Sequence, residues 1–190
     1  MANFNKFSAL PYIPYNIISH LAKDPKADGL WKLLKYSDVD ALSQPSLTLQ
    51  EKLALVWKGQ PKQNDFSIFF TRLVEDAQLE ERSLIKIYKA DTLPETHINA
   101  ICTYAFDLLT GAKTTVVDYE GVPCSRLDVM EMYLLQSLNG IDVSGVGFLQ
   151  FNHNFSRLSR STYGIGNNTS YIGTQLLMAV GVTDIDDRQC

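Results

Sequence analysis

The stretch Ile98-Asn-Ala-Ile-Cys-Thr-Tyr-Ala-Phe-Asp-Leu-Leu109 decides the fold that we expect for this chain. Every second position, from Ile98 through Tyr104 to Leu108, is apolar or aromatic, whereas the positions between them include Asn99 and Asp107. Successive side chains of a strand point to opposite faces of a sheet. Alternation over these twelve residues therefore predicts one long strand with one well-buried face.

Strand patterns lie on both sides of this stretch. Runs rich in aromatic and β-branched residues predict further strands at Phe66–Val74, Ser83–Lys89, Lys113–Tyr119, Gly145–Phe151 and Tyr171–Val182. The polar, glycine-containing segment 153–169 between the last two is predicted to be a loop. We therefore expect a sheet that is mainly antiparallel, because short turns connect most of these strands.

One capped helix interrupts the strands. Ser125-Arg-Leu-Asp128 has the pattern of a capping box, in which a side chain at each end satisfies a free backbone amide of the first turn. The helix that it opens is predicted to end near Leu138, before Asn139-Gly140. Its apolar positions have helical spacing and are Leu127, Met130, Leu134 and Leu138.

The N-terminal part predicts short helices. They are expected at Tyr15–Lys23, at Gly29–Tyr36, and from the capping box Thr48-Leu-Gln-Glu51 to about Lys58. The fold class is therefore α+β, with a mainly antiparallel sheet packed by one long helix and an N-terminal lobe of short helices. We place the boundary between residues 1–62, the helical segment, and residues 63–190, an α+β core with a projecting hairpin arm and loop.

Charge and composition exclude several functions. The 190 residues include 17 basic and 21 acidic side chains, a formal charge of −4, which does not suit a dedicated nucleic-acid binder. The charge is uneven: residues 1–90 carry 12 basic and 10 acidic side chains (+2), and residues 91–190 carry 5 and 11 (−6). No apolar run of 18 residues predicts a membrane span, and no basic and apolar signal opens the chain.

The residues that could bind a metal or act in catalysis do not form a recognisable motif. The histidines His20, His97 and His153 lie far apart, without the spacing of a metal site. Cys124 precedes the predicted N-cap Ser125, where a helix dipole lowers the pKa of a thiol. A thiol enzyme also needs a base, and the sequence indicates no partner for Cys124. We therefore expect no catalytic residue, metal site or cofactor.

The order of elements resembles the neck proteins of tailed bacteriophages, which include head–tail connectors, tail terminators and ring proteins. The resemblance covers about residues 65–185. The strand Ser83–Lys89 leads through Asp91-Thr-Leu-Pro94 to the long strand, and a hairpin arm at 113–121 and the capped helix follow. Asn139–Gly147 then leads into a further strand and a long polar loop. The resemblance is one of layout, and it does not extend to the N-terminal helices.

This resemblance implies a structural virion protein, made in the host cytoplasm, that forms a homo-oligomeric ring in the phage neck or tail. Such a ring joins the portal and head to the tail, contacts adjacent neck or tail proteins, and lets double-stranded DNA pass. We expect twelve copies rather than six, and no contact with a membrane. The residues expected at an interface or facing the channel are Lys113, Tyr119, Arg157, Arg160, Asn167 and Asn168.

Two other interpretations stay open. The first is a protein-binding adaptor module without a viral role, which would form a defined complex without cyclic symmetry. The second is a thiol enzyme centred on Cys124, whose activity would be lost in the variant Cys124→Ser.

Overall fold

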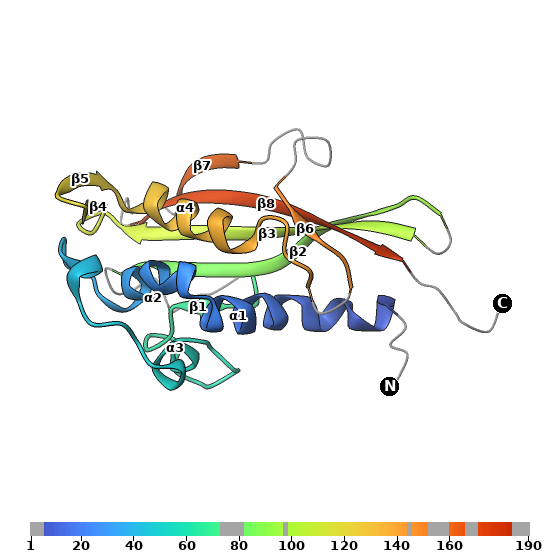
Figure 1. Cartoon of the computed structure of the whole chain (residues 1–190), viewed down its shortest axis with the longest axis horizontal. Helices are drawn as coiled ribbons and strands as arrows, with labels where there is room; N and C mark the ends of the chain where they lie inside the picture. Colours follow the sequence, from blue (N-terminus) through green and yellow to red (C-terminus); the bar gives the residue numbers. More distant parts are fainter. Residues whose placement is uncertain are drawn as a thin grey trace.

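The computed structural model describes residues 6–72, 82–96, 99–143, 146–151, 160–165 and 171–183. It confirms the α+β fold, because short helices come first, a mostly antiparallel sheet follows, and one long helix packs on that sheet (Figure 1). The helices are α1 (Ile13–Lys23), α2 (Asp28–Lys35), α3 (Leu49–Ala54) and α4 (Arg126–Leu138), with 3-10 helices at Lys6–Tyr12, Pro25–Ala27 and Ala41–Ser43. The strands are β1 (Ile68–Phe69), β2 (Leu84–Pro94), β3 (Asn99–Gly111), β4 (Val116–Tyr119), β5 (Val122–Ser125), β6 (Leu149–Gln150), β7 (Arg160–Ile165) and β8 (Tyr171–Thr183).

The long strand β3 lies in the middle of the sheet, as the alternation predicts. Its whole length pairs antiparallel with β8, from Asn99 opposite Thr183 to Gly111 opposite Tyr171. β2 pairs antiparallel on its other side, and β1 adds a short parallel pairing to β2. β6 and β7 pair with different parts of the remaining edge of β8. A separate two-stranded hairpin contains β4 and β5.

The main hydrophobic core lies on one face of the sheet, which we call the helix-covered face. Strand residues of this face include Tyr104 and Phe106 of β3 and Met178 of β8, and they share one buried cluster with residues of α1, α2 and α4. The Tyr104 hydroxyl also donates a hydrogen bond of 3.3 Å to the Leu10 carbonyl. The N-terminal helices and α4 therefore bury the same side of the sheet.

Helix α4 begins where the capping pattern predicts, with the Ser125 half of that pattern in place. The Ser125 side chain accepts a hydrogen bond from the Asp128 amide at 3.4 Å, which satisfies one free donor of the first turn. All four positions of the predicted apolar stripe are buried: Leu127, Met130, Leu134 and Leu138. After the helix, Gly140 has a φ of +83°, a left-handed conformation that favours glycine.

Arg126 joins α4 to the N-terminal helices. Its side chain is fully buried, and its guanidinium donates hydrogen bonds to four backbone carbonyls at the end of α2 and just beyond it. These carbonyls belong to Leu33 (3.2 Å), Tyr36 (2.8 Å), Ser37 (2.9 Å) and Asp38 (2.5 Å). Segments 1–62 and 63–190 thus share buried contacts, and their separation into two units stays a prediction.

Two predictions in the middle of the chain are corrected by the pairing of β1. The helix expected to reach Lys58 ends at Ala54, because Val56 bridges Ile68 in extended conformation instead. The strand expected at Phe66–Val74 is limited to Ile68–Phe69 among the residues described, since β1 has only this short parallel partner on β2. Tertiary strand pairing therefore overrides the local helical pattern here.

The predicted loop at 153–169 is also partly wrong. Residues 160–165 form β7, an edge strand whose backbone pairs antiparallel with β8 from Arg160 opposite Leu176 to Ile165 opposite Tyr171. The Ser, Thr and Gly content of β7 suggests a loop, but an edge strand needs only backbone partners. The predicted strand at 145–151 is shorter, because among its described residues only Leu149 and Gln150, which form β6, pair with β8.

Gly147 is expected to be intolerant of a side chain, because it lies directly against the backbone of β8. A Cβ atom placed there would overlap the carbonyl oxygen of Gly181, whereas a Cβ at Gly181 would meet nothing within 4 Å. We therefore expect Gly147→Ala to lower the free energy of unfolding by about 1–3 kcal/mol, a typical cost of overpacking. The matched variant Gly181→Ala should change it little. Urea denaturation of both measures this, and equal losses would contradict the close approach.

Candidate functional site

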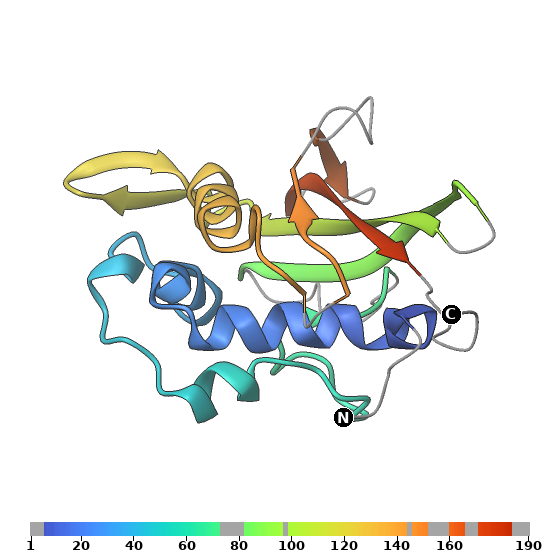
Figure 2. The same ribbon diagram turned by 45° about the vertical axis from the view of Figure 1, so that its right-hand side comes forward.

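The predicted projecting arm is present as the hairpin β4–β5, shifted along the sequence. The structure places the pairing at Val116–Ser125, whereas the prediction placed the arm at 113–121. The two-residue turn between the strands has left-handed backbone at Glu120 (φ 54°) and Gly121 (φ 81°), which matches a type I′ hairpin turn. Figure 2 shows the hairpin projecting beyond α4 at one end of the molecule.

The predicted site residues of this region have different environments. Lys113 is exposed in the turn after β3, outside the hairpin itself. Tyr119 ends β4 and is half-buried against the main core, so its ring supports the hairpin. The Asp118 amide donates a hydrogen bond of 2.8 Å to the Val39 carbonyl, which fastens β4 to the N-terminal segment.

Of the other predicted site residues, Arg160 is the one in the described part of the chain. Arg160 begins β7, and its backbone lies opposite Leu176 of β8. Arg157, Asn167 and Asn168 lie outside the described residues.

A polar cluster that the sequence analysis missed lies on the other side of the sheet, which we call the second face. Lys86 of β2, Asp107 of β3 and Gln175 of β8 are direct register partners, so they form one row across three strands. Gln175 Nε2 donates to Asp107 Oδ1 at 2.8 Å and to the Tyr88 hydroxyl at 3.1 Å, and that hydroxyl donates to Asp107 Oδ2 at 3.1 Å. The available signal was a long polar side chain among the apolar residues of each strand, at Lys86, Asp107 and Gln175.

Burial and charge shape the electrostatics of this polar cluster. Burial, and then the neighbouring Asp107 carboxylate, raise the pKa of Tyr88 to about 12, so its phenol stays protonated at a pH where an ordinary tyrosine ionises. Burial lowers the pKa of Lys86, and the Asp107 carboxylate partly offsets this effect. Both Lys86 and Asp107 are more than nine-tenths buried.

The raised pKa of Tyr88 predicts a pH-dependent contribution to stability. Because the folded-state pKa lies above the unfolded value of 10.0, this contribution is present below about pH 10 and is lost as the pH rises toward about 12. We therefore expect the wild type to lose unfolding free energy relative to Tyr88→Phe as the pH rises from about 10 to about 12. Denaturant titrations at several pH values measure it, and a constant difference would argue against the assignment.

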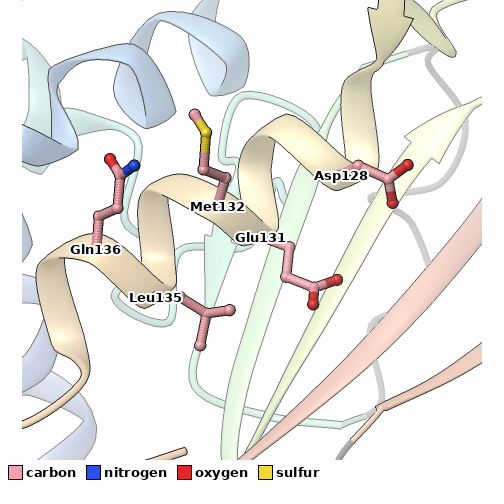
Figure 3. A pocket seen from close by; sticks show the side chains of 5 residues that line it. All are labelled: Asp128, Glu131, Met132, Leu135 and Gln136. Atoms are coloured by element: carbon pink, nitrogen blue, oxygen red, sulfur yellow. The ribbon is translucent and has the colours of Figure 1, made fainter.

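The surface of the described residues includes two pockets that bear on the candidate site. One, of about 500 Å³, adjoins the polar cluster and is lined by Phe70, Thr71, Arg72, Tyr88, Lys89, Ala90 and Gln175. The other, of about 380 Å³, lies along the outer side of α4 (Figure 3). Its lining side chains all come from that helix, with the carboxylates of Asp128 and Glu131 on one part and the apolar Met132 and Leu135 nearby.

The described residues provide no support for a base beside Cys124, which a thiol enzyme would need. Cys124 is half-buried in β5, opposite Val117. His20, the one histidine in the described part of the chain, lies on α1, where its Nε2 is 3.1 Å from the Ser137 carbonyl. Among these residues no group of three or more His, Cys, Asp or Glu side chains is placed to hold a metal ion. No helix described in the structure is long and apolar enough to span a lipid bilayer.

These features define an α+β protein in which helices cover one face of a long antiparallel sheet and a hairpin projects at one end. Residues 27–180 match the model of the YomW family, and the chain belongs to that family. YomW is a phage-derived family, of the Bacillus SPbeta-like kind. No curated protein matches the chain.

Proposed function

We propose that this chain is a structural virion protein that assembles into a ring in the neck or tail of a tailed phage. In this role the ring joins the portal and head to the tail and forms part of the channel through which double-stranded DNA passes. The observation that carries the proposal is membership of a phage-derived family, which covers residues 27–180. The resemblance of element order to neck proteins supports the specific role.

The projecting hairpin β4–β5 supports assembly. It extends away from the sheet and exposes Val122 by 56% and Val116 by 44%. A ring needs a heterologous interface, in which one surface of a subunit meets a different surface of the next. A projecting arm with exposed apolar side chains is suited to such a contact.

The oligomeric state tests the proposal. Native mass spectrometry and negative-stain electron microscopy of the purified chain, alone and mixed with the portal protein, are expected to show a cyclic oligomer, with twelve copies favoured over six. Mass spectrometry of purified virions is expected to detect the chain. A protein that stays monomeric under both conditions and is absent from virions would overturn the proposal, and a defined complex with another soluble protein would favour the adaptor alternative.

A pair of variants tests whether the hairpin forms the interface. Val122→Asp places a charge on an exposed position of β5, and it is expected to abolish the ring while leaving the monomer folded. Leu49→Asp is the matched control, because Leu49 is similarly exposed (47%) at the start of α3. Circular dichroism of both variants verifies folding. Rings that persist in Val122→Asp would assign the interface to another surface.

A further inference from the structure

The side of α1 that faces away from the core carries two exposed aromatic residues. Ile13, Ile17 and Leu21 are buried, whereas Tyr12 and Tyr15 are 62% and 51% exposed. Residues three or four apart in a helix are neighbours on its surface, so these two tyrosines lie together. The same spacing continues along the helix and defines what we call the outer stripe of α1: Tyr12, Tyr15, Ser19 and Lys23.

The β4–β5 hairpin has an open face, which we call the hairpin outer face. It consists of exposed residues that the register places together: Val116 opposite Ser125, and Asp118 opposite Pro123. Val117 and Tyr119 alternate with them along β4 and pack on the main core instead. Val39, which is 57% exposed, borders this face, because its carbonyl accepts the hydrogen bond of the Asp118 amide.

The two surfaces have opposite charge. The hairpin end carries the exposed carboxylates of Asp40, Asp118 and Glu120, and none of the three forms an ion pair among the described residues. Residues 1–23 contain two lysines and no acid, and Asp24, the first acid of the chain, follows the outer stripe. Opposite charges on two surfaces steer them together and disfavour wrong pairings.

The two surfaces lie toward opposite ends of the molecule (Figure 1). The hairpin follows Gly111, the last residue of β3, whereas the Leu10 carbonyl, just before the outer stripe, accepts the hydrogen bond of the Tyr104 hydroxyl. Tyr104 and Gly111 are seven positions apart (111 − 104) on β3, which is about 23 Å of strand. A contact between the hairpin outer face and the outer stripe therefore needs two copies of the chain.

We propose that the hairpin outer face of one copy docks on the outer stripe of α1 in the next copy. Tyr12 and Tyr15 are the aromatic anchors of this contact, and Val39 and Val116 are their apolar counterparts. Because the two surfaces differ, each contact leaves one of each kind free, and the contacts repeat until a ring closes. This inference rests on the proposed ring function and names the surface that its hairpin binds.

Two variants that each disable one surface test the contact. Val116→Asp adds a carboxylate to the apolar part of the hairpin outer face, and Tyr15→Asp places one in the outer stripe. Both positions are exposed, and an acid in the first turn of a helix favours the helix. Each variant alone is expected to lose the ring and to show the mass of a single chain in native mass spectrometry.

Mixing the two variants tests whether these two surfaces bind each other. The intact hairpin of Tyr15→Asp meets the intact outer stripe of Val116→Asp, whereas the other two surfaces are both disabled. The mixture is therefore expected to contain a heterodimer of twice the single-chain mass and no ring. Gln136→Asp, at an exposed position of α4, is the control and should form the ring as the wild type does.

The possible outcomes separate this contact from the proposed function. A wild-type chain that forms no cyclic oligomer, alone or with the portal protein, overturns the proposed function and this contact with it. A wild-type ring that persists in Tyr15→Asp, or a mixture without heterodimer while circular dichroism shows both variants folded, overturns the contact and leaves the ring function standing.

Discussion

Replacing Arg126 by alanine is expected to lower the free energy of unfolding by about 3–5 kcal/mol, because several carbonyls lose their donor and each buried acceptor left unsatisfied costs about 1–3 kcal/mol. The last carbonyls of a helix have no partner within the helix, and the dipole makes that end negative. Arg126 supplies both donors and positive charge to the end of α2 from the start of α4. Alanine leaves those carbonyls without these donors.

Two companion variants make the Arg126 result specific. Arg126→Lys keeps the charge, but one ammonium cannot reach four carbonyls, so an intermediate loss is expected. Lys35→Ala removes an exposed cation from the last turn of the same helix and should change stability by less than about 0.5 kcal/mol. Guanidinium denaturation measures all three. A loss in Arg126→Ala no larger than that in Lys35→Ala would refute the anchoring role.

The second large effect is expected at Leu134, in the middle of α4. This side chain has 0% exposure and belongs to the main core, so Leu134→Ala should cost about 2–5 kcal/mol through lost burial and a residual cavity. Leu135 provides the control, because it is the next residue of the same helix, is only partly buried against the core and lines the pocket along α4.

Leu134→Ala and Leu135→Ala change helix propensity by the same amount, so their difference reports packing alone. We expect Leu135→Ala to cost well under half as much. Denaturation curves of the two variants, recorded under identical conditions, give the comparison. Similar costs would mean that α4 packs in a different rotation from the one described.

The sequence predicts the long elements well where the signal lies in the residues of the element itself. The alternation from Ile98 to Leu109 identifies β3, and the cap at Ser125 with the apolar stripe identifies α4. These signals are local, because strand and helix periodicities assign each side chain to a face.

The errors occur where a partner strand decides the conformation. β1 and β7 are short, and their pairing with β2 and β8 depends on the assembled sheet. The same reason hid the polar cluster. Asp107 is visible as a polar residue in an apolar strand, but only the register with β2 and β8 places it beside Lys86 and Gln175.

The central position of β3 has a consequence for biosynthesis. β2 is made just before it, but β8 begins at Tyr171, 60 residues after Gly111 (171 − 111). At 5–20 residues per second, a ribosome needs roughly 3–12 s to supply that neighbour. During those seconds one edge of β3 is open to other nascent chains. Additional chaperone, which covers the open edge during those seconds, is therefore expected to raise the yield of folded protein.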